Sequence, residues 1–352
     1  MKKLFLLICL SFSGLFAVAN HITGGTIYYT YEKSGNDLIY HVILNLYRDS
    51  TSNGAQLDAQ TPIAIYENVT NKMVDSRMVS KSQTVALSLK NYSPCIQSPP
   101  IIKYQVGWYP FDVTLPPSPY GYTIVYQRCC RIAGINNLIG SSNTGATYTA
   151  QIPGFNSLPD APENNSAFFN GKDTVVVCAN NSFCYDFGAV DKDGDSLAYS
   201  FCNAYIGGST ANPSPNPPEE PPYSSVNYSG FYNESMPMGP DVHLDPKTGM
   251  VCGIAPAAGI YVVTVCVTEY RRGVPIAVQR KDVQIKVGDC NVADAALKPE
   301  YISCDGFNYT FSNEAPASPL IHTYFWDFGD GGTATTSNPT HNYADTGTYT
   351  FK

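Results

Sequence analysis

The sequence predicts an all-β protein made of consecutive antiparallel β-sandwiches. Three observations support this prediction. The 352 residues include 26 prolines, 28 glycines and 26 tyrosines, whereas only 14% are charged. This is the profile of many short strands joined by turns, and not of helices rich in Glu, Lys and Ala. Short alternating apolar and polar runs recur between turn signals at the spacing of a sandwich.

The first 19 residues read as a secretory signal peptide. Lys2 and Lys3 form a positive start, an apolar run follows from Leu4 to Leu10, and Ala17-Val18-Ala19 is a cleavage site. The apolar run is too short and too interrupted to span a membrane, and no other stretch approaches a transmembrane helix. We therefore expect a secreted protein, extracellular or on the outer cell surface.

The charge of the chain excludes one class of partner. The formal net charge is −8, and the basic residues form no cluster. An acidic chain of this kind is a poor ligand for phosphate backbones, so we expect no binding to nucleic acid.

Residues 20–155 are predicted to form an N-terminal β-sandwich. Strands at Thr26–Tyr31 and Leu38–Tyr47 flank the turn signal Ser34-Gly35-Asn36-Asp37 and read as a hairpin. Further strands are expected at Ile63–Asn68, Thr84–Leu89, Ile101–Trp108 and Tyr122–Arg128.

Residues 156–288 are predicted to form a second β-sandwich. A stretch rich in Pro, Asn and Asp, Ile152–Ser166, precedes it and reads as a linker. The Pro-rich segment Asn212–Pro222 is expected to be an exposed loop of polyproline-like conformation. The strands of this second sandwich are expected at Thr174–Cys178, Phe183–Phe187, Leu197–Phe201, Gly259–Glu269 and Ala277–Val287.

Residues 289–352 are predicted to form a third unit. Tyr324, Trp326 and Phe328 alternate with polar positions, as in a strand with one buried aromatic face. The run Gly329–Gly332 predicts a tight turn, because glycine adopts positive φ at little cost. A last strand is expected from Thr346 to Tyr349.

These motifs resemble the PKD domain, an immunoglobulin-like β-sandwich of extracellular proteins. The shared motifs are W-D-F-G-D-G, H-x-Y and G-x-Y, and we expect their residues to have a structural role in the core and turns. These residues are Trp326, Asp327, Phe328, Gly329, Asp330, Gly331, Tyr343, Gly347 and Tyr349. The last strand has only begun at Phe351-Lys352, so we expect the domain to be incomplete and the chain to be part of a longer protein. The resemblance implies tandem immunoglobulin-like sandwiches, the second of them cadherin-like or immunoglobulin-like, and the last a PKD domain.

The order of landmarks along the chain resembles large exported proteins of Bacteroidota. Those proteins typically end in a gliding-motility-associated sorting domain used by type IX secretion, and no such domain is present in this sequence. The resemblance implies a secreted or surface-attached structural or adhesive protein, and it does not imply an enzyme. The landmarks are His21–Gly25, Leu46–Asp49, Gly121–Arg131, Asp191–Tyr199, Asp245–Gly249 and Glu269–Arg271.

Ten of the 11 cysteines lie outside the signal peptide, an even number that argues for disulfides in an exported chain. We expect a bond between Cys290 and Cys304, and a bond from Cys95 to Cys129 or Cys130. The other five are an odd number, so one of them bonds the remaining member of Cys129 and Cys130 or stays free. These five are Cys178, Cys184, Cys202, Cys252 and Cys266. Zinc binding is the competing interpretation, but it needs C-x₂₋₄-C knuckles and none is present.

The run Asp191-Lys192-Asp193-Gly194-Asp195 is the clearest candidate site. Three carboxylates at alternate positions repel one another unless a cation neutralises them, and hard oxygen ligands suit Ca²⁺. An EF-hand is excluded, because Ser196 and Cys202 stand where it needs glycine and glutamate. The run resembles a turn of cadherin-like bacterial domains, in which calcium sits at a domain junction, and Glu163 could supply a further oxygen. The alternative is a solvated acidic hairpin tip.

Other candidate chemistry is weaker. Asp327 and Asp330 could be an acid–base pair, but Asp327 points off the buried face and Asp330 lies in a turn. His21 would bind copper only as the first residue, and the cleavage rule makes Asn20 the first. No nucleophile, zinc-protease or phosphate-loop motif is present, so no catalytic residue is predicted.

Trp108 and Tyr109 could form a surface on which a sugar stacks, although aromatic residues in sandwiches are more often buried. We therefore predict a non-enzymatic surface protein, a structural or adhesive array stiffened by calcium, whose partners are extracellular or cell-surface proteins or glycans. The alternative is a carbohydrate-binding accessory protein of a polysaccharide-degrading system.

Overall fold

The computed structural model divides into two compact units. The first contains the described residues of 1–89 and 102–287, and the second those of 90–101 and 288–352. The described residues are 22–34, 37–51, 56–88, 96–97, 99, 101–171, 173, 175–292, 295–302, 304, 306–315 and 321–352. The predicted signal peptide, His21 and Cys95 lie outside them. Within these ranges the regular structure is strand plus one 3₁₀ turn, and no helix could cross a membrane.

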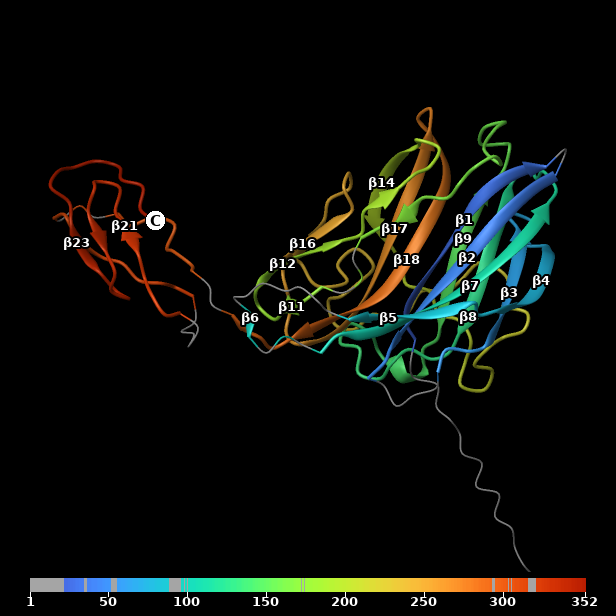
Figure 1. The fold of residues 1–352 in the computed structure, drawn as a ribbon, viewed down its shortest axis with the longest axis horizontal. Coiled ribbons are helices and arrows are strands. Elements are labelled where there is room, and N and C mark those ends of the chain that lie inside the picture. Colours follow the sequence, from blue (N-terminus) through green and yellow to red (C-terminus); the bar gives the residue numbers. More distant parts are fainter. Residues whose placement is uncertain are drawn as a thin grey trace, which may run out of the picture. The chain divides into compact units, whose positions relative to one another are not determined.

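Two facing layers of strands in the first unit form an N-terminal sandwich (Figure 1). One layer contains β1 (Ile22–Ser34), β2 (Asp37–Asp49), β7 (Lys103–Leu115) and β5 (Gln83–Ser88). The other contains β4 (Met73–Ser80), β3 (Gln60–Glu67), β8 (Gly121–Arg128) and β9 (Ala146–Pro153). The predicted hairpin is confirmed, because β1 and β2 pair antiparallel in one register from Gly24↔Tyr47 to Ser34↔Asp37. Alternate residues of both layers, such as Tyr40, Ile63 and Ile124, meet in one core.

The long strand β18 (Val274–Gly288) belongs to both halves of the first unit. It pairs along its length with β17 (Gly259–Arg271), which in turn pairs with β14 (Ser196–Phe201). Its other edge pairs with β1, at Gly24↔Val283, and with β9, at Gln279↔Ala150. Strands from before and after the expected boundary at residue 155 therefore share one 12-stranded sheet.

The glycines of the N-terminal landmark permit this close pairing. A Cβ on Gly24 would lie 2.3 Å from the backbone oxygen of Asp282, a separation that real Cβ atoms do not reach. Without a side chain at this position β1 can lie directly beside β18. The expected boundary at 155/156 consequently separates two hydrophobic cores but does not separate two sheets.

A second core lies between β14, β17 and β18 on one side and a three-stranded sheet on the other. That sheet contains β12 (Ser182–Asp186), β16 (Met250–Ile254) and β15 (Val242–Leu244). Phe183, Phe187, Val265 and Ile285 are among the side chains buried between them. Two short pairings complete this half, β10 (Phe168–Phe169) with β13 (Ala189–Val190), and β11 (Val177–Cys178) with β18.

The Pro-rich segment 212–222 is less exposed than expected. Pro215 and Pro218 are buried, although most of the other residues are exposed. The hydroxyl of Tyr66 donates a hydrogen bond to the Pro218 carbonyl, and the Cys129 amide donates to the Pro213 carbonyl at 2.8 Å. The segment is therefore attached to the first sandwich by main-chain carbonyls, which proline leaves available as acceptors.

The second unit has a small aromatic core. Its pairings are β6 (Ile96–Gln97) with β19 (Asn291–Val292), β20 (Asn308–Thr310) with β23 (Thr340–Asn342), and β21 (Trp326–Asp327) with β22 (Thr333–Ala334). Trp326 and Phe328 are buried with Phe311 and Tyr343, as the alternation predicted. The strand expected at Thr346–Tyr349 is absent from the described residues. Instead, Asp327 and Lys352 exchange backbone hydrogen bonds of 3.1 and 2.8 Å.

Candidate functional site

The acidic run forms a tight turn between β13 and β14. The Oδ1 atom of Asp191 accepts hydrogen bonds from the backbone amides of Asp193 and Asp195, each at 2.9 Å. Gly194 has φ of 81°, which glycine adopts without strain. The three carboxylates offer oxygens that lie within 4.8 Å of one another, so the structure brings the predicted ligands together.

A guanidinium group offsets part of the negative charge of this cluster. Nε and Nη2 of Arg271, at the end of β17, donate to the two oxygens of Asp195 at 3.0 and 2.7 Å. Nη2 also lies 3.1 Å from Oδ2 of Asp193. The Arg271 side chain is only 11% exposed. The planar fork therefore makes the charge-assisted, paired contacts that are the strongest kind of hydrogen bond.

The segment that the sequence predicted as a linker connects this turn to the first sandwich. Asn165 donates to both oxygens of Asp193, from its backbone amide at 2.7 Å and its side-chain amide at 2.6 Å. Its Oδ1 atom accepts from the amide of Tyr31 on β1 at 2.9 Å, and Ser166 Oγ accepts from the amide of Tyr29 at 2.8 Å. The linker is consequently a fixed bridge between β1 and the acidic turn.

Glu269 lies beneath this bridge and is fully buried. Its carboxyl oxygens accept from the Asn164 side chain at 2.6 Å and from the Ala167 amide at 2.8 Å. Burial raises the pKa of Glu269 to about 7, and the nearby charge of Asp191 acts in the same direction. The Glu269 carboxyl group therefore changes its protonation state near neutral pH.

Hydrogen bonds already engage most of the carboxylate oxygens that the sequence predicted as calcium ligands. Five of the six carboxylate oxygens already accept hydrogen bonds, and only Oδ2 of Asp191 has no partner among the described residues. Glu163, the fourth predicted ligand, instead pairs with Lys33 at 2.6 Å and is 43% exposed. Arg271 supplies one positive charge to three carboxylates, and Oδ2 of Asp191 is buried without a hydrogen-bonding partner in the described part of the chain.

The predicted aromatic surface is divided between two faces of β7. Tyr109 is fully buried in the first core, and its hydroxyl donates to the Asp58 carbonyl at 2.7 Å. Trp108 faces the other way and is half-buried. Adjacent residues of a strand point to opposite sides, so the two rings cannot form one stacking surface. Tyr109 is not available to a sugar in this structure.

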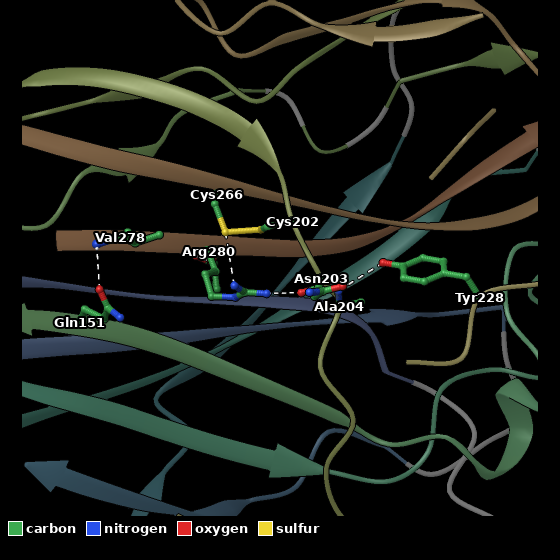
Figure 2. Close-up of a disulfide and its surroundings, with 9 residues drawn as sticks. Gln151, Cys202, Asn203, Ala204, Tyr228, Cys266, Val278 and Arg280 are labelled. Carbon is green, nitrogen blue, oxygen red and sulfur yellow. Dashed lines mark hydrogen bonds between the residues drawn. A yellow bond between two sulfur atoms is a disulfide. The ribbon is translucent and has the colours of Figure 1, made fainter. Parts of the chain in front are cut away.

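Two disulfides join neighbouring strands of the second sandwich. Cys184 and Cys252 are opposite each other on β12 and β16, and Cys202 and Cys266 join the segment after β14 to β17. Figure 2 shows Arg280 of β18 beside the second bond. Its Nη1 atom donates to the sulfur of Cys266 at 3.3 Å, and Nη2 donates to the Asn203 carbonyl. Both bonds stabilise mainly by restricting the unfolded chain.

Two expected pairings are wrong. Cys129 and Cys130 bond each other, so neither bonds Cys95. Cys304 has a free, exposed thiol, so it does not bond Cys290, which is itself disulfide-bonded, as is Cys178. The sequence could not settle this connectivity, because spacing along the chain does not report which cysteines meet in space.

The acidic pair of the C-terminal unit is structural. Oδ1 of Asp327 accepts from the Gly329 amide at 3.0 Å, and Asp330 accepts from the Gly332 amide at 2.9 Å and contacts His341 Nε2 at 2.7 Å. The His341 contact lowers the pKa of Asp330. Both side chains therefore hold turns rather than face a substrate.

The other motif positions pack the same core. The hydroxyl of Tyr343 donates to the Phe328 carbonyl at 3.0 Å, and its ring stacks on that of Tyr349 at 4.2 Å. A Cβ on Gly329 would lie 2.4 Å from the Thr350 oxygen, so this position requires glycine. Gly347 lies in the loop between Tyr343 and Tyr349.

The sequence interpretation did not assign Arg271 or Glu269 to the site. A signal was present, because Glu269 has the same parity on β17 as the buried Val263, Val265 and Val267. A carboxylate in such a row must find buried partners, since an unpaired buried charge is costly.

Residues 291–352 match the PKD domain family. No curated protein matches the chain. The C-terminal unit is therefore a PKD domain, a β-sandwich module that is typical of extracellular proteins and is itself non-catalytic.

Proposed function

We propose that this chain is part of an exported, non-enzymatic surface protein in which rigid β-sandwiches act as structural or adhesive spacers. The observation that supports this most strongly is the fusion of two sandwiches through β18, followed in the sequence by a PKD domain. A shared central strand prevents the hinge motion that a flexible linker would allow. Rigidity of this kind is useful to a protein that holds a binding surface away from a cell.

The acidic turn contributes to this rigidity. Arg271 and Asn165 connect the turn to the segment that the sequence predicted as a linker, and this segment in turn connects to β1. Asp193, Asp195, Asn165 and Arg271 each have a hydrogen-bonding partner from a different segment. Buried polar networks that are well satisfied fix one arrangement of the chain.

The proposed location is the outer cell surface of a member of the Bacteroidota, reached through type IX secretion. The signal peptide motif and the order of landmarks support this proposal. Protease treatment of intact cells that express the tagged full-length protein tests it. Digestion on intact cells is expected, and protection until the outer membrane is opened would contradict surface exposure.

Adhesion is tested with the purified chain immobilised on beads. Retention of cells or of matrix protein supports an adhesive function. A glycan array tests the alternative, carbohydrate binding, with Trp108→Ala as the matched variant. Selective glycan binding that is lost in Trp108→Ala would favour the carbohydrate-binding alternative over the adhesive one.

Calcium stiffening remains a prediction from the sequence. The engagement of Arg271 argues that an ion would bind only if this side chain moved away. Thermal unfolding with calcium and with chelator tests it. A calcium-dependent rise in the midpoint that Asp193→Ala abolishes would establish the metal site, and an unchanged midpoint or an equal rise in Asp193→Ala would refute it.

A further inference from the structure

One lysine lies in a row of core-facing positions on β18. Val283, Ile285 and Val287 all point into the second core, and Lys281 has the same parity. The Lys281 side chain is only 1% exposed. A lysine at such a position needs a specific partner, because burial of an ammonium group in apolar surroundings is costly.

The partner is Asp173, in the segment before β11. Nζ of Lys281 is in direct contact with Oδ1 of Asp173, whose side chain is 17% exposed. The rings of Phe169 and Phe187 flank the ammonium group, each with its centroid 5.8 Å from Nζ. The hydroxyl of Tyr47, from β2, donates to Oδ2 of Asp173 at 2.8 Å. One amine, one carboxyl group and one hydrogen-bond donor are therefore held together in an aromatic cage.

This arrangement differs from the surface ion pairs of the chain. Lys33 and Glu163 are also in contact, but both are about half exposed and water competes for them. In the cage, the Lys281 ammonium group is kept from water and the Asp173 carboxylate is largely kept from it, at a cost in free energy. Proton transfer from Nζ to the carboxylate would remove both charges and leave a neutral amine, which is the nucleophilic form.

We propose that Lys281 and Asp173 form an intramolecular amide bond. After the proton transfer, Nζ attacks Cγ of Asp173 with its electron pair, and the bond from Cγ to Oδ1 breaks. Oδ1 leaves as water, carrying the first proton and a second one from Nζ. Oδ2 remains as the carbonyl oxygen of a secondary amide. The step is redox-neutral and needs no co-reactant.

The geometry supplies the two contributions that such a step requires. The fold holds nucleophile and electrophile in contact, which replaces a bimolecular encounter with a reaction inside one site. Tyr47 donates to the oxygen on which negative charge develops as Nζ adds to the carbonyl. Burial and the charge of Asp173 raise the pKa of the Tyr47 phenol well above its usual range, so Tyr47 keeps the proton that it donates.

The bond would close the second sandwich covalently. Asp173 precedes β11, at the start of this sandwich, and Lys281 lies on its last strand. The disulfides Cys184–Cys252 and Cys202–Cys266 of this sandwich lie between these positions in the sequence. Unlike them, an amide would survive a reducing environment, which suits a protein that must resist force or proteases on a surface.

Mass spectrometry of the denatured, fully reduced full-length chain tests the proposal. The wild-type mass should be lower than the sequence mass by one water molecule, and digestion should give a branched peptide that joins Lys281 to Asp173. Lys281→Met and Asp173→Ala should each restore the full mass. The matched control Lys33→Met, at the exposed pair, should still have a mass one water molecule below that of its sequence.

The branched peptide is read from the wild-type chain, so the test does not depend on the folding of any variant. A full wild-type mass with Lys281 and Asp173 in unbranched peptides would overturn the proposal and leave a simple ion pair. Loss of water located elsewhere, for example at Asp193-Gly194, would also overturn it. For Tyr47→Phe, the cross-linked fraction should grow more slowly after refolding than in the wild type. An unchanged rate of cross-linking would overturn the role of Tyr47 in the reaction.

Discussion

The buried carboxyl of Glu269 should make the first unit less stable as the pH rises through neutrality. An unperturbed Glu in the unfolded chain titrates near 4.5, whereas burial raises the pKa in the folded chain to about 7. Between these values the folded state binds more protons than the unfolded state, so stability falls with rising pH. The contribution is fully present below pH 4.5 and is lost as the pH rises to about 7. The difference of about 2.5 units corresponds to about 3 kcal/mol.

The assay compares urea unfolding at pH 5 and pH 8 for the wild type and Glu269→Gln. Only two tryptophans are present, so Trp326→Phe in both chains leaves Trp108 as the reporter of the first unit. His41 also has a raised pKa, owing to Asp112 and Glu32, and loses stability in the same direction. The comparison with Glu269→Gln removes this shared contribution. The wild type should lose about 2.5 kcal/mol more than the variant between the two pH values, because a small part of the contribution is already lost at pH 5. Equal losses in both chains would refute the argument.

Three further changes test other parts of the structure. Arg271→Ala should lower the free energy of unfolding in urea by about 3–5 kcal/mol, because it leaves Asp193 and Asp195 without their cation. Calcium should then raise the melting temperature of this variant more than that of the wild type. An equal calcium response in both chains would contradict this. Gly24→Val should cost at least about 1–3 kcal/mol, since its Cβ would meet the Asp282 oxygen at 2.3 Å, and an unchanged urea midpoint would show that β1 and β18 separate easily. Trp326→Ala should destabilise the PKD domain by about 3–5 kcal/mol, read as faster hydrogen exchange in residues 321–352, and unchanged exchange there would contradict its core role.

Local alternation predicted many of the central strands. The hairpin of β1 and β2 was predictable because its alternating runs flank a turn signal, and the buried faces of β8 and β17 are rich in apolar residues. The strand β4 was missed, since it is an edge strand in which only Val79 is buried and the apolar residues do not alternate with polar ones. Such a strand leaves no regular alternation in the sequence.

Pairing between distant segments could not be predicted. The register Gly24↔Val283 depends on chain segments at opposite ends of the first unit, and no local pattern in β18 reports that both of its edges are used. For this reason the sequence indicated two sandwiches and two cores but not their common sheet.

The candidate site was predicted in part. The spacing of Asp191, Asp193 and Asp195 correctly indicated a cluster that needs a positive charge. It did not reveal that Arg271 supplies this charge, because a carboxylate cluster suits a guanidinium group as well as a metal ion. Tyr109 was assigned to a surface because the neighbouring Trp108 suggested one, although alternation places it in the core.

Native-state hydrogen exchange at increasing urea concentration tests most directly whether the two sandwiches form one rigid body. The shared strand β18 and the bridge at Asn165 predict that the amides of β2 and β17 open together, with the same free energy and the same dependence on urea. Opening of β17 at a clearly lower free energy, while β2 stays protected, would show two independent sandwiches and contradict the rigid spacer.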